Sequence, residues 1–151
     1  MLKLPPPIWT LIYIIISATI SWLLDWPTPP GLPLLPLGIT LVAVAFIAPV
    51  WAFVLFRREG TEIDPTSPTN RKLITSGPYH FTRNPMYLGH IIFLTGLTLA
   101  LRSWFAGLIT VAVAVWFHSR VLDDEKKLAV RLGKLYIDYT KSVKRWIPGL
   151  F

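Results

Sequence analysis

Two adjacent carboxylates stand on an expected apolar helix face, Asp124 at its edge and Glu125 within it. Apolar residues recur with helical spacing between residues 121 and 143, and at about 100° per residue Glu125 falls in the middle of their face. A carboxylate placed there costs roughly 2–3 kcal/mol unless it is ion-paired, hydrogen-bonded or turned into a polar cavity. Glu125 is therefore a candidate ligand-binding residue. The structural alternative is an ion pair with Arg120 or with another loop arginine.

The remaining residues of this segment divide into two faces. This division predicts an amphipathic helix over residues 122–143 that lies at a membrane interface with its basic face toward water. The apolar face carries Val121, Leu128, Leu132, Tyr136, Tyr139 and Val143. The opposite face carries Asp123, Lys126, Lys127, Arg131, Lys134, Asp138, Lys141 and Lys144.

Several kinds of chemistry are not expected. The chain has no cysteine, so it has no disulfide, no thiolate metal site and no cysteine nucleophile. Its three histidines, His80, His90 and His118, form no HxxxH pair, and we expect no metal site. His90 and His118 fall in apolar helices, where a hydrogen-bonded structural histidine is the usual finding. No GxGxxG motif follows a strand, which excludes a Rossmann-type cofactor site.

The elements that must position these residues are predicted to be membrane helices. The chain is 53% hydrophobic, above the roughly 45–50% of soluble domains, and its apolar runs match the roughly 17–25 residues of a spanning helix. We therefore predict an all-α integral membrane protein of one domain, residues 1–151, with about four transmembrane helices and the C-terminal interfacial helix. The predicted spans cover residues 8–24, 32–56, 86–101 and 104–121.

Details of the first two spans follow from single residues. The first apolar run is expected to be a retained span and not a cleaved signal peptide, because Pro5, Pro6 and Pro7 follow Lys3. Pro49 is expected to kink the second span.

The charge distribution predicts the orientation. Lys+Arg number 15 against 8 Asp+Glu, and the basic residues gather in the loop 57–85 and after Arg120. By the positive-inside rule, both termini and this loop lie in the cytoplasm, in a multi-pass arrangement. We expect the net charge of +7 to serve topology and contact with membrane lipids, and we expect no nucleic-acid partner.

Two segments resemble a known family. Residues 73–79 (LITSGPY) and 83–89 (RNPMYLG) closely resemble the signature of the isoprenylcysteine carboxyl methyltransferase and phospholipid methyltransferase superfamily. The tail follows the same family's pattern, and the resemblance extends over the C-terminal half, from Gly60-Thr61 onward. The matching tail positions are Asp124-Glu125, Leu128, Leu132-Gly133, Tyr136, Tyr139, Val143, Arg145 and Ile147-Pro148.

This chain departs from the family pattern at two places. The branch that methylates prenylated cysteine usually has Arg-His-Pro where this chain has Arg83-Asn84-Pro85. The acidic pair, usually two glutamates, begins here with Asp124. An asparagine at the position of Asn84 occurs in the broader bacterial-type branch, which weakens the expectation that the acceptor is a prenylated protein.

The resemblance implies methyl transfer from S-adenosylmethionine to a lipophilic acceptor, with the cofactor site on the cytoplasmic side. Glu125 and Asp124 would accept hydrogen bonds from the ammonium or ribose of the cofactor, and Arg83 or Arg145 would bind its carboxylate. Gly77 and Gly89 would allow the main chain to approach the cofactor closely. Tyr79 and Tyr87 would stack on its adenine or face its sulfonium. The full expected cofactor-binding set is Gly77, Tyr79, Arg83, Asn84, Tyr87, Gly89, Asp124, Glu125 and Arg145.

Other functions remain open at this point. One is a phospholipid amine N-methyltransferase, and another, of a different class, is a non-enzymatic membrane anchor or assembly factor. The anchor hypothesis explains the basic helix but gives Glu125 no purpose. A transporter or channel is disfavoured because the first three spans carry no buried charge and the chain has no internal repeat. No residue is a persuasive general base, which favours an acceptor that is already nucleophilic.

Overall fold

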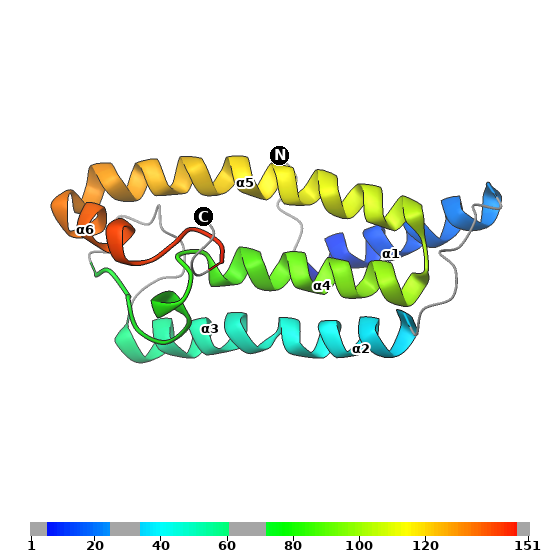
Figure 1. Cartoon of the computed structure of the whole chain (residues 1–151), viewed down its shortest axis with the longest axis horizontal. Helices are drawn as coiled ribbons and strands as arrows, with labels where there is room; N and C mark the ends of the chain where they lie inside the picture. Colours follow the sequence, from blue (N-terminus) through cyan, green and yellow to red (C-terminus); the bar gives the residue numbers. More distant parts are fainter. Residues whose placement is uncertain (1–5, 25–33, 61–71, 148–151) are drawn as a thin grey trace. The chain divides into compact units, whose positions relative to one another are not determined.

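The computed structural model describes residues 6–24, 34–60 and 72–147, with side chains from residue 12 (Figure 1). No strand occurs in these ranges, and the prediction of an all-helical protein is confirmed. The helices are α1 (Pro6–Leu23), α2 (Leu34–Ala45), α3 (Ile47–Glu59), the 3₁₀ helix η1 (Gly77–His80), α4 (Pro85–Leu101), α5 (Trp104–Leu132) and α6 (Lys134–Ser142). The expected turn between the first two spans and residues 61–71 of the long loop lie outside the described residues.

Two helical segments are long and apolar enough to cross a membrane. They are Leu34–Glu59, with 26 residues, and Trp104–Leu132, with 29, and only 17% of the most apolar window of each is buried. A core helix of a soluble protein would be mostly buried. Two shorter apolar helices, Ile12–Leu23 and Pro85–Leu101, accompany them. This composition of helices fits an integral membrane protein.

Local sequence signals explain two helix boundaries. The segment 34–59 is interrupted at Phe46, and Pro49 follows three residues later. Because proline has no amide hydrogen, the carbonyl of Ala45 loses its usual helical donor, and the helix breaks there. At the start of α5, the hydroxyl of Ser103 accepts a hydrogen bond from the amide of Ala106 at 3.2 Å, which is the N-cap interaction.

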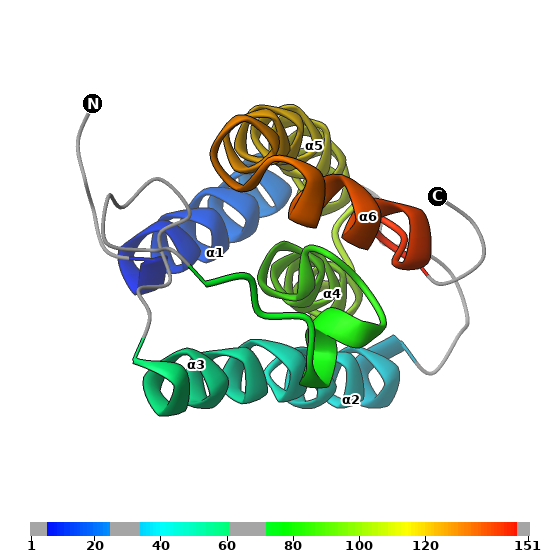
Figure 2. The ribbon, with the colours of Figure 1, turned by 90° about the vertical axis from the view of Figure 1, so that its left-hand side faces the viewer.

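The C-terminal region differs from its expected arrangement. Residues 122–132 do not begin a separate helix but continue α5, because no helix-breaking residue stands between Val121 and Leu132. The break comes at Gly133, which has φ +54° and ψ −130°, and α6 follows it (Figure 2). The apolar face assigned to the membrane interface packs instead inside the protein. Tyr136, Tyr139 and Val143 form a buried cluster with Leu73, Leu128, Ala129 and Leu132 around it.

The chain divides into two compact units. The first contains residues 1–44 and 91–113, and the second contains residues 45–90 and 114–151, so α4 and α5 contribute to both. In the first unit the hydroxyl of Tyr13 lies 2.9 Å from that of Thr98 and 3.0 Å from that of Thr110. This hydroxyl cluster joins α1 to α4 and α5 within an apolar core, as interhelical hydroxyls do in membrane helices.

The second unit holds α3, η1, the first turn of α4, the C-terminal part of α5, and α6. η1 lies beside α3, and α6 leaves the end of α5 after Gly133 (Figures 1 and 2). All nine of the expected cofactor-binding residues belong to this unit.

Candidate functional site

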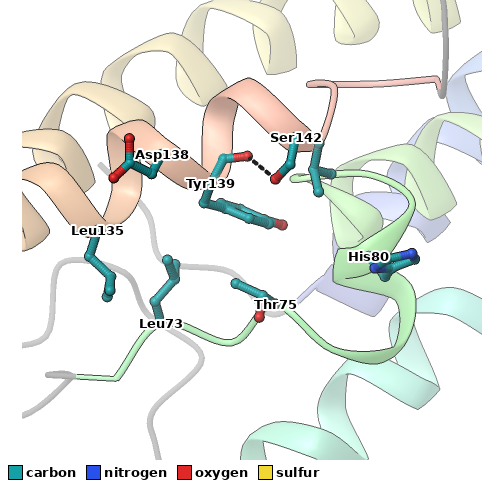
Figure 3. A pocket seen from close by; sticks show the side chains of 8 residues that line it. Leu73, Thr75, His80, Leu135, Asp138, Tyr139 and Ser142 are labelled. Atoms are coloured by element: carbon teal, nitrogen blue, oxygen red, sulfur yellow. Dashed lines mark hydrogen bonds between the residues drawn. The ribbon is translucent and has the colours of Figure 1, made fainter.

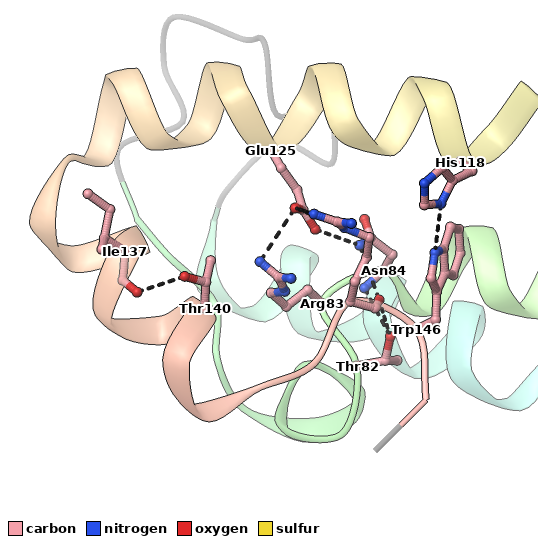
Figure 4. Close-up of polar contacts among 9 residues, drawn as sticks. Thr82, Arg83, Asn84, His118, Glu125, Ile137, Thr140 and Trp146 are labelled. Atoms are coloured by element: carbon pink, nitrogen blue, oxygen red, sulfur yellow. Dashed lines mark hydrogen bonds and ion pairs between the residues drawn. The ribbon is translucent and has the colours of Figure 1, made fainter. Parts of the chain in front are cut away.

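Glu125 lies on the C-terminal part of α5, and three side chains from two other segments share its carboxylate (Figure 4). Its Oε2 atom accepts hydrogen bonds from Nε and Nη2 of Arg145 at 3.1 and 2.8 Å. The same oxygen lies 3.4 Å from Nη1 of Arg83, and Oε1 accepts a hydrogen bond from Nδ2 of Asn84 at 3.3 Å. Four of the expected site residues are thus in direct contact.

These contacts explain how a carboxylate can occupy an apolar helix face. Glu125 forms ion pairs with two guanidinium groups, so its desolvation is offset by charge-assisted hydrogen bonds. The partners are Arg83, which is a loop arginine, and Arg145. The structural alternative in the sequence named Arg120 first, and no ion pair between Arg120 and Glu125 is found in the described part of the chain.

Hydrogen bonds to two main-chain carbonyls, those of Lys144 and Arg145, hold the two arginines in place. The amide of Arg83 donates to the carbonyl of Lys144 at 3.0 Å. The carbonyl of Arg145 accepts hydrogen bonds from the hydroxyl of Thr82 at 2.9 Å and from Nδ2 of Asn84 at 3.3 Å. The loop before α4 and the segment after α6 are therefore joined side by side, and their arginines meet at one carboxylate.

Pro85 and Trp146 lie next to the two segments that carry the arginines, and each holds its segment in position. Pro85 is the first residue of α4, where a missing amide hydrogen costs nothing and the fixed φ favours a helix start. Trp146 donates from Nε1 to Nδ1 of His118 at 3.2 Å, and the two rings stack. This contact ties the segment that carries Arg145 to α5 a second time.

One donor of this cluster has no acceptor. The side chains of Arg83 and Glu125 are each 11% exposed, and that of Arg145 is 28% exposed. Among the atoms that the structure describes, Nε of Arg83 is buried and has no hydrogen-bond partner. An unsatisfied buried donor costs about 1–3 kcal/mol, and a carboxylate or phosphate group would satisfy it. The hydrogen bond to Glu125 raises the pKa of Arg145, so the second guanidinium also stays charged.

Asp124 and Tyr87 form a second polar pair. The hydroxyl of Tyr87 donates to Oδ2 of Asp124 at 2.9 Å, and Nζ of Lys127 lies 3.5 Å from Oδ1. Asp124 is buried, and the ring of Tyr87 packs edge-on against Phe117 at 5.1 Å. The acidic pair of the sequence therefore has two different environments, with arginines around Glu125 and a tyrosine and a lysine around Asp124.

Tyr136 and Tyr139 lie close enough to Arg83 and Glu125 for these charges to act on both phenols, and Tyr139 is hydrogen-bonded to Tyr79. The hydroxyl of Tyr139 donates to the carbonyl of Tyr79 at 2.6 Å, and the ring of Tyr79 packs edge-on against Phe56 of α3. Burial raises the pKa of Tyr79 and Tyr139, and it raises that of Tyr136 to about 12, with a further contribution from Glu125. The nearby guanidinium of Arg83 acts in the opposite direction on the pKa of Tyr136.

Tyr136 was not among the residues expected to form the site. Its position on the apolar face together with a polar hydroxyl was the signal in the sequence. A buried phenol needs a polar neighbour, and in this structure Arg83 and Glu125 are nearby.

The two glycines of the motif are explained by packing. A Cβ on Gly89 would lie 2.4 Å from Cγ of Pro49 and 2.8 Å from the carbonyl oxygen of Ala45, so α4 packs closely at this point. Gly77 has φ +60°, and a Cβ there would lie 2.5 Å from Leu55 of α3. Both positions require glycine for the fold itself, and their part in cofactor binding stays a prediction.

Comparisons with known proteins place these features in context. The family model described as phospholipid methyltransferase matches residues 34–132. The protein-S-isoprenylcysteine O-methyltransferase of Dictyostelium discoideum is 34% identical over 80 residues, which make up 52% of this chain and 33% of that protein. The proteins of the same name from Mus musculus and Schizosaccharomyces pombe are 33% and 31% identical over 78 residues, 50% of this chain and 27% and 33% of theirs. The match covers a third or less of each relative's length, and the resemblance seen in the sequence is confirmed.

Proposed function

The chain belongs to the phospholipid methyltransferase family, and on this premise we propose that it transfers a methyl group from S-adenosylmethionine to a lipophilic acceptor in the membrane. The observation that carries the proposal is the contact of Arg83 and Arg145 with Glu125, next to a buried Nε of Arg83 that lacks an acceptor. A zwitterionic amino-acid end needs both a guanidinium and a carboxylate within reach, and this cluster supplies both.

Each candidate residue has a role in this proposal. S-Adenosylmethionine supplies an electrophilic methyl group on a sulfonium. Arg83 binds the cofactor's carboxylate through its Nε edge, with Arg145 as the second candidate. Asp124 and Glu125 accept hydrogen bonds from its ammonium or ribose hydroxyls. Asn84 orients the carboxylate of Glu125 through Oε1.

Aromatic residues and glycines complete the proposed site. Tyr87 and Tyr79 offer ring faces to the sulfonium or to adenine, and the hydrogen bond to Asp124 fixes the orientation of Tyr87. Gly77 and Gly89 let η1 and α4 pack closely on neighbouring segments, and in this proposal they thereby bring the motif's main chain close to the cofactor. Methyl transfer is an in-line displacement, so alignment of donor and acceptor by these rigid contacts can supply up to several kcal/mol of rate acceleration.

The membrane arrangement is also part of the proposal. Four spans, with both termini and the Arg83–Glu125–Arg145 cluster on the cytoplasmic side, satisfy the distribution of lysine and arginine. A water-soluble cofactor then enters from the cytoplasm, and a lipophilic acceptor arrives laterally between helices. Basic residues on the exposed side of α5 and α6, among them Lys126, Lys134 and Lys141, contact anionic lipid headgroups.

Two acceptor classes fit this proposal. The relatives named protein-S-isoprenylcysteine O-methyltransferase suggest a lipid-linked carboxylate, which needs no general base. A phospholipid amine is the alternative, favoured by the description of the matching family and by Asn84 in place of the usual histidine.

The test is incubation of the purified full chain with labelled S-adenosylmethionine, in separate reactions with a farnesylcysteine analogue, phosphatidylethanolamine or a total lipid extract. We expect label in a lipophilic product, and its identity decides between the two acceptors. Absence of label in all three reactions, together with absence of donor binding, would leave the chain as a non-enzymatic membrane anchor.

A further inference from the structure

Two large apolar side chains of the second unit are exposed next to the segments that carry the arginines. Phe81, directly after η1, is 57% exposed, and Ile147, after α6, is 49% exposed. The neighbouring His80 lines a pocket between residues 73–80 and α6, but Phe81 is not among the residues that line it (Figure 3). Exposed apolar side chains are common on proteins, so what surrounds these two depends on where they lie relative to the membrane.

Hydrogen bonds place these two side chains at the same end of a pair of segments. An amide and a hydroxyl of residues 82–83 donate to the carbonyls of residues 144–145, at 3.0 and 2.9 Å. The earlier residue of each segment bonds the later residue of the other, so the two segments run in opposite directions. Phe81 precedes the first segment and Ile147 follows the second, and both therefore lie at one end of the pairing.

The contact of Trp146 with His118 relates this end of the pairing to a position along α5. Nε1 of Trp146 donates to Nδ1 of His118 at 3.2 Å, and the two rings stack (Figure 4). His118 follows Trp104, the first residue of α5, by 14 residues, which is about 21 Å of helix. The hydrocarbon core of a bilayer is about 30 Å thick. With α5 crossing the bilayer from Trp104, the residues beside Trp146 lie within the depth of the acyl chains.

The length of α4 leads to a similar depth for Phe81. α4 has 17 residues, which is about 26 Å of helix and less than the roughly 30 Å of hydrocarbon. Because a span that is too short carries an energetic cost, apolar side chains next to its ends stabilise the protein when they cover the difference. Phe81 precedes Pro85, the first residue of α4, by four residues, so at 3.3–3.6 Å per residue their Cα atoms are at most about 14 Å apart. An aromatic side chain at such a boundary is a common membrane anchor.

We propose that Phe81 and Ile147 insert into the cytoplasmic leaflet and form a lipid-facing lip beside the Arg83–Glu125–Arg145 cluster. The inference rests on the membrane arrangement in the proposed function. Lys144, which is exposed in the same pair of segments, matches the negative charge of lipid headgroups next to the acyl chains. Because hydrogen bonds join the lip to the segments of both arginines, its insertion holds the cluster at the level of the headgroups.

The test uses single introduced cysteines that carry a nitroxide label, because the native chain has no cysteine. Phe81→Cys and Ile147→Cys are prepared separately in the full chain and placed in bilayer discs of phosphatidylcholine and phosphatidylglycerol. Paramagnetic resonance then measures how readily the label meets oxygen, which concentrates in lipid, and a nickel chelate, which stays in water. We expect the ratio of oxygen to nickel accessibility at both positions to be several-fold higher than at an exposed position in water. Circular dichroism checks that helix content is unchanged.

Two positions on α5 calibrate this ratio. Val130→Cys is the matched control, because Val130 is apolar and 89% exposed but follows Trp104 by 26 residues, about 39 Å of helix and beyond the hydrocarbon core. Its label should meet the nickel chelate. Val115→Cys is the reference for lipid, because Val115 is 63% exposed and lies about 17 Å from Trp104 along the helix. Its label should meet oxygen.

The outcomes separate the inference from the arrangement on which it rests. Lipid readings at residues 81, 147 and 115, with a water reading at 130, support the lip. If 115 reads as lipid and 130 as water, but 81 or 147 also reads as water, the inference is overturned. A label at 81 or 147 that neither reagent reaches is covered by protein, and this result overturns the inference as well. If 115 reads as water or 130 as lipid, the proposed membrane arrangement itself fails.

Discussion

Arg145 and Glu125 are joined by two hydrogen bonds to one oxygen, from Nε and Nη2 to Oε2, at 3.1 and 2.8 Å. The whole of α6 lies between these two residues in the chain. Their contact, with Arg83 on the same oxygen, therefore fixes the segment after α6 against α5 and gathers two positive charges at one place. Folding of the C-terminal region and the proposed binding of the cofactor depend on the same carboxylate.

Glu125→Gln tests this double role. The substitution nearly preserves shape but removes the charge that two guanidinium groups share. We expect the free energy of unfolding in detergent to fall by about 1–3 kcal/mol. This is less than for a fully buried ion pair, because Arg145 is partly exposed and solvent screens its charge. Affinity for S-adenosylhomocysteine should fall by about 1.5–3 kcal/mol, the scale of hydrogen bonds to charged groups. Asp123→Asn on the exposed side of α5 is the control, and lost stability with intact affinity would restrict Glu125 to a structural role.

Arg83→Lys tests the candidate anion binder. Lysine keeps the positive charge but has no counterpart of Nε, the buried donor that lacks an acceptor. We expect weaker binding of S-adenosylhomocysteine, measured by calorimetry, in a protein with near-normal helix content by circular dichroism. Unchanged affinity would transfer the role to Arg145, which Arg145→Lys would then test in the same way.

The raised pKa of Tyr136 predicts that the stability of the folded protein decreases at alkaline pH. Burial, with a smaller contribution from Glu125, raises the pKa of Tyr136 from 10.0 to about 12 in the folded protein. The unfolded chain releases this proton first, so the stabilisation is complete below pH 10 and declines as the pH rises toward about 12. Thermal unfolding across this range should be less pH-dependent in Tyr136→Phe than in the wild type. Equal slopes for the two proteins would contradict the assignment.

Gly89→Ala and Gly107→Ala test how closely α4 packs at Gly89. Both glycines lie in helices, and only Gly89 is in a tight contact. A Cβ at residue 89 would lie 2.4 Å from Cγ of Pro49, whereas one at residue 107 would lie 3.6 Å from Thr98, an ordinary contact. We expect Gly89→Ala to cost about 1–3 kcal/mol of unfolding free energy through overpacking. Gly107→Ala should be neutral or stabilise by up to about 1 kcal/mol, because alanine loses less backbone entropy in a helix. Thermal denaturation in detergent measures both, and equal effects would show that α4 can shift at Gly89.

The topology can be tested by labelling single introduced cysteines, because the native chain has none. Cysteines at Thr69 and Lys134 should react with a membrane-impermeant reagent from the cytoplasmic side, and one at Thr28 from the opposite side. Thr28 and Thr69 lie outside the described residues. Labelling of Thr28 and Thr69 from one side would contradict the four-span arrangement.

Several features could be predicted from the sequence because they depend on neighbouring residues. Apolar runs of sufficient length predicted helices apolar enough to cross a membrane, and Pro49 predicted the interruption of 34–59, which occurs at Phe46. The motifs at 73–79 and 83–89 identified the family before any contact was known, and that identification is confirmed. The position of Glu125 on an apolar face showed that it needed a partner.

The identity of that partner was decided by tertiary structure. The sequence offered Arg120 and the loop arginines without distinguishing them. The choice depends on hydrogen bonds from the hydroxyl of Thr82 and the amide of Arg83 to carbonyls more than sixty positions away. The apolar face of residues 121–143 could pack on lipid or on protein with the same periodicity, and only the contact with Leu73 shows that it packs on protein. Periodicity reports which side of a helix avoids water. What covers that side is determined by segments distant in the sequence, and therefore by the fold.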